Sequence, residues 1–410
     1  MQNPFQNAMA QLEKVAKVKD LGDEFLMRLR QPDRDIRVSI PVKMDDGSMK
    51  IFEGYRVQYN NALGPYKGGL RYHEDTEINE VKALGFWMVL KCGVAGIQMG
   101  GGKGGIAVDP GKLSKGELEG LTRGWTDRLS DVLGPYKDVP APDVNTTPEI
   151  MGWIADEYAK ITGDKTGAVT TGKPLGQGGS EGRNTATAQG GFYVFETLKQ
   201  ELQLPKKCNV VIQGFGNVGS NAALIWHKAG HTVIAVSETQ GGIYNSNGLD
   251  IEKLVEFKKK NGNISGFSQK DSQNIEITNQ ELLALECDLL IPAAFENQLT
   301  KDNAGEIKAK VILELANGPT TPEADEILFQ KNIPLVPDIL ANAGGVIVSS
   351  FEWEQNLKNE HWSEEEVFKK LKEKLEESSK KMLEKSREHK TSMRIGAFIL
   401  ALERIKDKMS

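Results

Sequence analysis

A glycine-rich run surrounds a single lysine in the first third of the chain. Residues 99–105 read Met-Gly-Gly-Gly-Lys-Gly-Gly, with Lys103 among five glycines. Glycine is costly to order, so glycines this close indicate a backbone that passes where a Cβ atom would clash. A lysine held there in a dehydrated, cationic cleft would have a lowered pKa and could act as a base near neutral pH. A glycine-rich surface loop with a solvated lysine is the alternative, and a phosphate-binding loop is excluded because Gly104 stands where that motif has Ser or Thr.

Three further segments carry charged residues in a suggestive order. Lys67 lies in Gly-Pro-Tyr-Lys-Gly-Gly-Leu-Arg-Tyr-His, which covers residues 64–73. Lys91 follows the apolar run Ala-Leu-Gly-Phe-Trp-Met-Val-Leu, near the end of a helix predicted over 78–92. Asp143 closes the segment Asp-Val-Pro-Ala-Pro-Asp. A single lysine is more often a surface residue and a single aspartate a loop cap, so the order and spacing of the four together carry the argument.

These motifs together resemble the glutamate dehydrogenase family, within the wider group of amino-acid dehydrogenases. The resemblance extends from about Pro41 to about Arg404. It implies reversible oxidative deamination, in which L-glutamate, NAD(P)⁺ and water give 2-oxoglutarate, ammonium and NAD(P)H. By the same resemblance, Lys103 is the catalytic lysine and Asp143 exchanges protons with the substrate nitrogen.

The resemblance also assigns substrate contacts. It places Lys67, helped by Ser349, on the γ-carboxylate of glutamate and Lys91 on the α-carboxylate. A dianionic substrate does need two separate cationic anchors. Three neighbouring lysines would repel one another and lower the pKa of the least solvated one, which we expect to be Lys103.

Supporting residues carry over from the same family, each with a simpler structural alternative. Arg183 and Thr187 match positions that line the cleft and touch the nicotinamide carboxamide, although Thr187 could be an ordinary helix-interior threonine. Asn317 and Asn342 match loop amides near the nicotinamide ribose and the substrate, and either could instead be a turn asparagine. Val346 would pack on the substrate methylenes, or serve simply as a core valine.

A second motif predicts dinucleotide binding without reference to any family. An apolar strand pattern at 209–213 runs into Gly-Phe-Gly-Asn-Val-Gly, a helix pattern follows to Lys228, and a second strand covers 232–236. Glu238 stands 19 residues after the third glycine, where an acid can accept hydrogen bonds from ribose hydroxyls. Because its carboxylate should repel a 2′-phosphate, we expect NAD in preference to NADP, unless Glu238 is only a surface turn residue. The predicted cofactor-binding residues are Glu238, Gly214, Phe215, Gly216, Asn217, Val218 and Gly219.

The pattern of elements predicts an α/β protein with two domains and a cleft between them. Residues 1–178 are expected to form a substrate-binding and oligomerisation domain with a mixed sheet, and residues 179–392 a Rossmann-like NAD(P)-binding domain. A turn-rich linker at 171–180 separates them, and residues 393–410 should form a helix that packs back on the first domain. Expected strands lie at 36–40, 49–52, 56–59, 289–292 and 311–314, expected helices at 5–30, 117–133, 148–161 and 185–202, and polar loops at 294–298, 316–319 and 338–346.

Composition limits the class of protein. The 410 residues are 39% hydrophobic and 26% charged with a net charge of −6, which gives no reason to expect nucleic acid or an anionic membrane as partner. No apolar run approaches the length of a membrane span, and the N-terminus lacks a signal-peptide pattern. Three widely spaced cysteines fit a reducing cytoplasm, and the five histidines lack metal-ligand spacing, so no metal site is expected.

Two other functions remain open on sequence alone. A relative acting on leucine, valine or phenylalanine would have apolar residues where this chain has Lys67 and Ser349, because an unpaired lysine in an apolar pocket is costly. A catalytically silent dinucleotide-binding regulatory protein would not need Lys103 and Asp143. The family resemblance further implies a homohexamer built as two stacked trimers.

Overall fold

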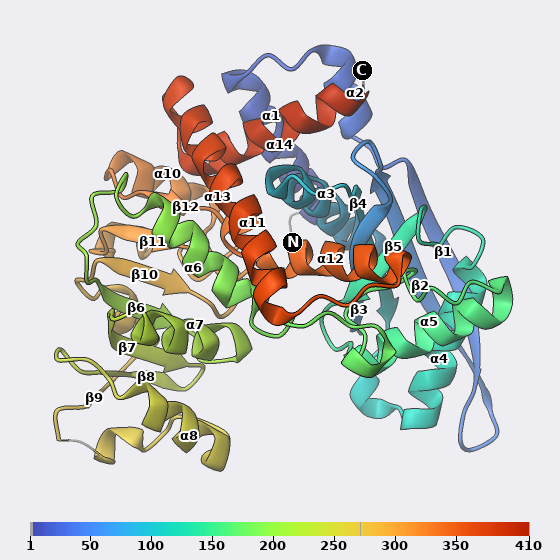
Figure 1. Cartoon of the computed structure of the whole chain (residues 1–410), viewed down its shortest axis with the longest axis horizontal. Helices are drawn as coiled ribbons and strands as arrows, with labels where there is room; N and C mark the ends of the chain where they lie inside the picture. The colour runs from blue at the N-terminus through green and yellow to red at the C-terminus, as the bar shows by residue number, and fades with distance from the viewer. Residues whose placement is uncertain (1–2, 271, 410) are drawn as a thin grey trace. The chain divides into compact units, whose positions relative to one another are not determined.

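The computed structural model describes residues 3–270 and 272–409, and the chain divides into two compact units (Figure 1). The first unit contains the described residues of Met1–Arg183, Val346–Val367 and Phe398–Ser410, and the second contains Asn184–Gly345 and Phe368–Ala397. The division therefore differs from the predicted one, which ran unbroken from 179 to 392. Residues 346–367 belong to the first unit because Glu352 forms a buried ion pair there with Lys173.

The first unit is built on a five-stranded mixed sheet in the order β1-β2-β4-β3-β5. Strands β1, β2 and β4 pair antiparallel, whereas β4, β3 and β5 run parallel. The strands predicted at 49–52 and 56–59 are one continuous strand, since every residue from Met49 to Gln58 pairs with β1. The five strands are β1 (Arg34–Lys43), β2 (Met49–Asn60), β3 (Tyr66–His73), β4 (Gly101–Ala107) and β5 (Asp138–Pro142).

The glycine-rich run is the interior strand β4, a structure the sequence did not predict. Its neighbours leave no room for side chains, as the glycine spacing indicated. A Cβ atom on Gly101 would lie 2.3 Å from the Val89 nitrogen, and one on Gly105 would lie 2.5 Å from Cγ2 of Thr76. Glycine normally weakens a strand, but here it admits close approach by the backbone of Val89 and the side chain of Thr76.

Helices cover this sheet and complete the apolar core of the unit. Ile40, Tyr72, Ile106 and Trp125 are fully buried together, which joins strands β1, β3 and β4 to helix α4. Thr147 caps α5 and Pro148 begins it, as predicted. The helices of this unit are α1 (Pro4–Val18), α2 (Asp23–Leu29), α3 (Ile78–Ala95), α4 (Lys115–Leu129) and α5 (Pro148–Thr162), with the short turns η1 (Pro110–Lys112) and η2 (Leu175–Gln177) and most of α12 (Gly344–Lys358) and α14 (Met393–Met409).

The second unit contains a seven-stranded sheet in the order β12-β11-β10-β6-β7-β8-β9. Strands β12 to β7 run parallel, and β8 and β9 extend the edge antiparallel. The first strand, β6, lies between β10 and β7, which makes it the point where strand order reverses and where open α/β sheets bind ligands. The strands are β6 (Asn209–Gln213), β7 (Thr232–Glu238), β8 (Gly241–Tyr244), β9 (Ile275–Ile277), β10 (Leu289–Pro292), β11 (Val311–Leu313) and β12 (Leu335–Val336).

One segment predicted as a loop is helical instead. The segment expected as a loop at 338–346 instead forms α11 (Asp338–Ala341) and the start of α12. The remaining helices are α6 (Ala186–Leu198), α7 (Asn217–Lys228), α8 (Ile251–Asn261), α9 (Asn279–Leu283), α10 (Pro322–Gln330), most of α13 (Glu364–Glu388), and the turns η3 (Phe267–Lys270) and η4 (Ala304–Glu306).

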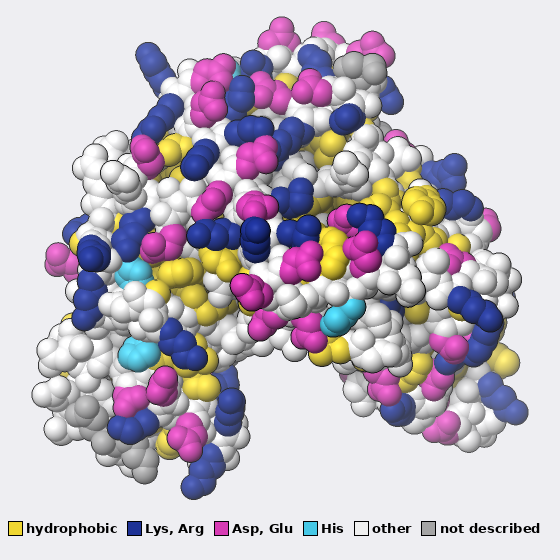
Figure 2. Space-filling view, viewed as in Figure 1, with side chains coloured by type: hydrophobic (Ala, Val, Ile, Leu, Met, Phe, Trp, Pro, Cys, Tyr) yellow, Lys and Arg dark blue, Asp and Glu magenta, His cyan; other side chains and the backbone are white. Residues whose placement is uncertain are grey.

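The described surface carries charges of both signs. On the face shown in Figure 2, Lys and Arg side chains are intermingled with Asp and Glu side chains. Among the described helices, none combines the length and apolarity that crossing a bilayer requires.

Candidate active site

One face of strand β3 organises the predicted catalytic residues. Residues 67, 69 and 71 alternate onto the same face of this strand. Because Leu70 pairs with Gly104 on β4, Gly69 lies across from Lys103. A Cβ atom on Gly69 would lie 2.6 Å from the Asp143 Cβ, so the missing side chain provides the space that the aspartate occupies.

Lys103 and Asp143 form a direct ion pair at this position. The Lys103 Nζ lies 2.6 Å from the Asp143 Oδ2, and the lysine side chain is 7% exposed. Burial lowers the pKa of Lys103, Asp143 opposes that shift, and Arg71 and Arg56 add to it. Burial alone would raise the pKa of Asp143, but Lys103 and Arg71 outweigh it and hold the pKa below its usual value. The pKa of Lys103 is thus lowered in the predicted direction, but by burial and two arginines rather than by the other lysines.

Lys67 is the more deeply buried of the two lysines, at 1% exposure against 6% for Lys103. The expectation that Lys103 is the least solvated lysine is therefore wrong. Burial, together with the nearby Arg56, lowers the pKa of Lys67 to about 7. Its ammonium donates to Oγ1 of Thr171 at 2.8 Å and to the carbonyl oxygens of Val139 and Pro140 at 3.1 and 3.4 Å.

Thr171 contacts the predicted substrate lysine Lys67, and the sequence did not indicate this contact. It lies 104 residues from Lys67 in a segment interpreted only as a linker. Its backbone nitrogen donates to the Pro140 carbonyl at 3.1 Å, which fixes the segment against strand β5. The buried Glu352 accepts from the Gly172 nitrogen at 2.8 Å and pairs with Lys173, so this linker segment is a rigid wall of the site.

Helix α12 contributes the remaining predicted substrate residues. Ser349 is 1% exposed, and its Oγ accepts a hydrogen bond from Nε of Arg183 at 3.2 Å. Val346 lies one turn earlier on the helix and is half-buried. The positive charge of Arg183 also lowers the pKa of Lys67, so the two cations lie close enough to repel each other.

Lys91 lies on helix α3. It is half-buried near the C-terminal end of that helix, beside the buried Cys92. Burial raises the pKa of the Cys92 thiol to about 12, while Lys67 and Lys91 both act to lower it. Both ammonium groups therefore lie within electrostatic range of the same sulfur. In the first unit the structure thus pairs Lys103 with Asp143 and places Lys67 and Lys91 near Cys92.

The glycine motif of the second unit fits a dinucleotide pyrophosphate. Gly214 follows β6 at φ +91°, and a Cβ atom on Gly219 would lie 1.9 Å from the Gly214 carbonyl oxygen. Gly216 has open space around its Cβ position and begins α7 with no side-chain cap. The free N–H groups and helix dipole at this end suit a phosphate. Phe215 is buried, so only its backbone could face a cofactor.

Glu238 ends strand β7 as predicted, but its carboxylate is already engaged. Its Oε1 pairs with Nζ of Lys258, and its Oε2 accepts from the Ile264 nitrogen at 2.9 Å. Lys258 also donates to the Phe215 carbonyl oxygen of the glycine loop. Glu238 borders a hollow of about 320 Å³ that Gln240, Ile264 and Ser265 also line. No sequence pattern indicated the role of Lys258, which lies on helix α8, 20 residues after Glu238.

Two predicted loop amides meet beyond the carboxyl end of β11. Nδ2 of Asn342 donates to Oδ1 of Asn317 at 2.9 Å and to the Ala316 carbonyl at 3.0 Å. The Oδ1 of Asn342 is buried and has no hydrogen-bond partner among the described residues. A buried acceptor without a donor is costly, so this atom fits a ligand donor such as a hydroxyl or amide. Thr187 lies half-buried in the first turn of α6, close in sequence to Asn184, whose carbonyl accepts from Asn217.

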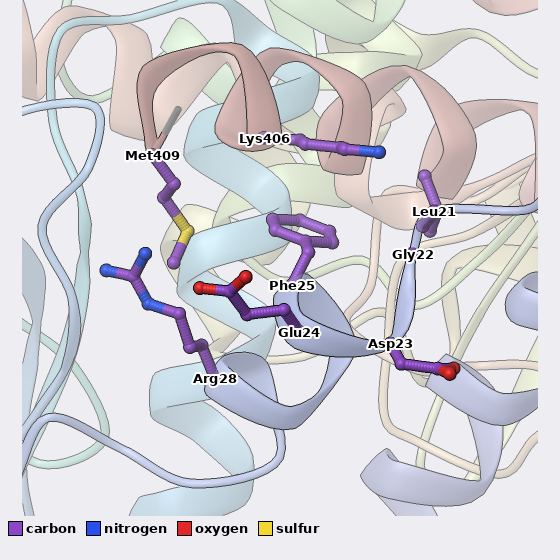
Figure 3. Close-up of a pocket in the computed structure, with 8 residues that line it drawn as sticks. All are labelled: Leu21, Gly22, Asp23, Glu24, Phe25, Arg28, Lys406 and Met409. Carbon is purple, nitrogen blue, oxygen red and sulfur yellow. The ribbon is translucent and has the colours of Figure 1, made fainter.

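The cavity drawn in Figure 3 is separate from these residues. It has a volume of about 450 Å³, and its walls come from α2 and from Lys406 and Met409 of α14. None of the predicted catalytic, substrate or cofactor residues lines it. Within residues 3–270 and 272–409, no group of three or more His, Cys, Asp or Glu side chains is arranged to hold a metal ion.

Comparison with known proteins agrees with this geometry. Residues 32–160 match the family model "Glu/Leu/Phe/Val dehydrogenase, dimerisation domain", and residues 178–410 match "Glutamate/Leucine/Phenylalanine/Valine dehydrogenase". The chain is 45% identical to the NADP-specific glutamate dehydrogenase of Synechocystis, covering 99% of this chain and 96% of the relative. It is 46% identical to the catabolic NAD-specific glutamate dehydrogenase of Bacillus subtilis, covering 96% and 91%.

A solved structure extends the similarity to three dimensions. The hetero-hexameric glutamate dehydrogenase of Thermus thermophilus superposes with a TM-score of 0.92 at 35% identity, covering 100% of this chain and 97% of that one. The chain therefore belongs to the Glu/Leu/Phe/Val dehydrogenase family.

Proposed function

We propose that this protein is a glutamate dehydrogenase, which converts L-glutamate and NAD(P)⁺ reversibly to 2-oxoglutarate, ammonium and NAD(P)H. One observation carries the choice of substrate within the family. Within the described residues, the hydrogen bonds of the buried Lys67 ammonium go to uncharged oxygens, those of Thr171, Val139 and Pro140. The nearby Glu352 raises the pKa of Lys67 but is itself paired with Lys173. A counter-ion in direct contact favours the charged form of a buried lysine, and the γ-carboxylate of glutamate would supply it. The side chain of leucine, valine or phenylalanine would leave the cation unpaired.

The substrate contacts follow from this placement. Lys67, Thr171 and Ser349 would bind the γ-carboxylate, with Arg183 holding the Ser349 hydroxyl in place. Lys91 would bind the α-carboxylate, and Val346 would pack on the methylenes between. The α-carbon would then lie over Gly69, beside the Lys103–Asp143 pair.

The chemistry would divide between Lys103 and Asp143. Asp143, held ionised by two cations, would accept a proton from the substrate ammonium. A bound nicotinamide would accept hydride from the α-carbon, and water would add to the resulting iminium carbon. Lys103 would take a proton from that water, and burial, which lowers its pKa, favours the neutral form that can do so. Asp143 would finally return its proton to the nitrogen, and the hydroxyl proton would pass to the departing ammonia, which leaves 2-oxoglutarate and ammonium.

The second unit would hold the cofactor. The pyrophosphate would lie at the N-terminus of α7 against residues 214–219, and the ribose hydroxyls of the adenosine would face Glu238. Asn317 and Asn342 would contact the nicotinamide ribose, with Thr187 at the carboxamide. Relatives named as NAD-specific and NADP-specific are equally similar to this chain, so identity alone does not decide between the cofactors.

We infer that NAD is preferred because Glu238 is an acid, but that Lys258 weakens the preference by neutralising it. Lys258→Met should leave an unneutralised carboxylate facing any 2′-phosphate. We expect the ratio of kcat/KM for NAD to that for NADP to rise about tenfold, since one charge pair at this range is worth about 1–3 kcal/mol. Steady-state kinetics with both cofactors measures it, and Glu238→Gln should move the ratio the other way. An unchanged ratio in Lys258→Met would contradict the inference.

We also propose a cytoplasmic homohexamer. The support is the match of residues 32–160 to a dimerisation domain and the likeness to a hetero-hexameric enzyme. Light scattering on the purified protein should give six times the mass of the chain, and a monomer mass would refute the assembly.

One assay separates the candidate functions. Oxidation of NADH or NADPH should be fast with 2-oxoglutarate and ammonium, and slow with 4-methyl-2-oxopentanoate, the oxo acid of leucine. The reverse order would identify a branched-chain amino-acid dehydrogenase. Fast turnover with phenylpyruvate instead would identify an aromatic amino-acid dehydrogenase, and absence of turnover with all three oxo acids, in protein that binds NADH, would identify a silent regulatory protein.

A further inference from the structure

Arg71 touches the proposed catalytic pair but has no part in the chemistry above. It lies on strand β3, four residues after Lys67 and on the same face. Its Nε donates to the Asp143 Oδ2 at 3.2 Å, and the same oxygen lies 2.6 Å from Nζ of Lys103. One carboxylate oxygen is thus shared by two cations from neighbouring strands.

Arg71 is itself clamped by an acid from helix α3. Another nitrogen of its guanidinium group, Nη1, forms an ion pair with Oε1 of Glu80. Glu80 lies in the first turn of α3, where its backbone nitrogen donates to the capping side chain of Glu77 at 2.7 Å. The arginine therefore bridges a fixed helix start to the proposed proton shuttle, and its side chain is only 19% exposed.

Gly69 explains why the arginine can reach its target. The Asp143 side chain fills the space that a Gly69 side chain would need, directly between Lys67 and Arg71. The Asp143 side chain therefore lies between Lys67 and Arg71 along β3. Its Oδ2 contacts Arg71 of β3 and Lys103 of β4. The other charges on this cluster are Glu80, on the far side of Arg71, and Arg56, which acts on Lys103 from strand β2.

We propose that Arg71 is a positioning residue that, clamped by Glu80, holds Asp143 ionised against Lys103 and so prepares both groups for proton transfer. The inference rests on the proposed function of the same site. Two electrostatic effects of Arg71 act in one direction: it lowers the pKa of Asp143 and it lowers the pKa of Lys103. Asp143 must be ionised to accept the first proton and Lys103 must be neutral to accept the later proton from water, so both effects extend activity toward lower pH.

The test is the pH profile of glutamate oxidation in Arg71→Met, Arg71→Lys and Glu80→Gln. In Arg71→Met, kcat should fall about 10- to 100-fold with the KM for glutamate within about threefold. The acidic limb of kcat/KM should move to higher pH by about one unit, because Asp143 and Lys103 each lose a neighbouring cation. In Arg71→Lys, the acidic limb of kcat/KM should lie close to its wild-type pH. Glu80→Gln, which keeps the arginine, should lower kcat less than Arg71→Met does.

Arg387→Met is a matched control, because Arg387 is an exposed arginine of the second unit that pairs with Glu201. Its profile should match the wild type, and thermal unfolding identifies any variant that is misfolded. The inference is overturned if folded Arg71→Met keeps the wild-type acidic limb, or if Arg71→Lys shifts it as far as Arg71→Met. A wild-type protein that binds NADH but does not oxidise glutamate would instead overturn the proposed function.

Discussion

Replacing Lys103 by methionine is expected to lower kcat for glutamate oxidation about a thousandfold, within the usual contribution of a general acid–base group. The lysine is buried against Asp143, where its pKa is lowered by burial and by two arginines, so its loss removes the proposed base from the site. The KM for glutamate should change by less than about tenfold, because Lys67 and Lys91 carry the proposed substrate contacts. Steady-state and single-turnover kinetics measure the effect on the chemical step.

The control for this change is the same substitution at an exposed lysine outside the candidate site. Lys112→Met removes an exposed lysine that pairs with Asp109 and Glu74, and its activity should equal that of the wild type. NADH binding by Lys103→Met should be unchanged, since residues 214–219 belong to the other unit. A Lys103→Met protein that folds, binds NADH and keeps more than about a tenth of the wild-type kcat would rule out Lys103 as the base.

Replacing Lys67 by methionine is expected to lower kcat/KM for glutamate about a thousandfold. The substrate γ-carboxylate would then be buried without a cation, which costs about 3–5 kcal/mol. The effect should depend on the carboxylate, so the comparison substrate is L-norvaline, which has no γ-carboxylate. Activity on norvaline should fall little or rise. An equal loss with both substrates would show that Lys67 does not recognise the side-chain carboxylate.

The same residue should leave a signature in the pH dependence of binding. Burial lowers the pKa of Lys67 to about 7, so above that pH the free site holds mostly neutral lysine. A bound carboxylate favours the charged form, so binding of 2-oxoglutarate at pH 8 should take up a proton. The KM for 2-oxoglutarate should accordingly rise as pH increases above 7, and Lys67→Met should lose both the rise and the proton uptake seen by calorimetry in two buffers.

Local pattern was enough to predict the nucleotide-binding half of the molecule. Strand β6, the glycine loop, helix α7 and the acid at the end of β7 follow one another within 30 residues, so each reinforces the interpretation of the next. Strand β4 was not predicted, for the opposite reason. Its seven residues include four glycines, which are depleted in strands, and only the close approach of Val89 and Thr76 makes glycine necessary there.

The site was predictable where residues belong to conspicuous motifs and unpredictable where they act through distant partners. Lys67, Lys103 and Asp143 could be predicted because each stands in a distinctive segment that resembles a known family, and their roles stay predictions. Thr171 and Lys258 were missed because their roles depend on contacts made across 104 and 20 residues of chain. Arg71 belongs to the same segment, 64–73, as Lys67. Only the structure shows that it contacts Asp143, whose side chain lies against Gly69.

Relative burial could not be judged from sequence either. Lys103 was expected to be the least solvated lysine because of its glycine neighbours. The structure buries Lys67 more deeply, since Thr171 and strand β5 close over it. The two lysines therefore differ in environment: Lys67 is deeply buried among uncharged oxygens, whereas Lys103 is paired with Asp143.

The decisive experiment is a crystal structure of the Lys103→Met protein soaked with L-glutamate. The γ-carboxylate is expected within hydrogen-bond distance of Nζ of Lys67, the α-carboxylate at Lys91, and the amino group beside Asp143. Glutamate bound in the opposite orientation, with its α-carboxylate on Lys67, or bound away from strand β3 would contradict it.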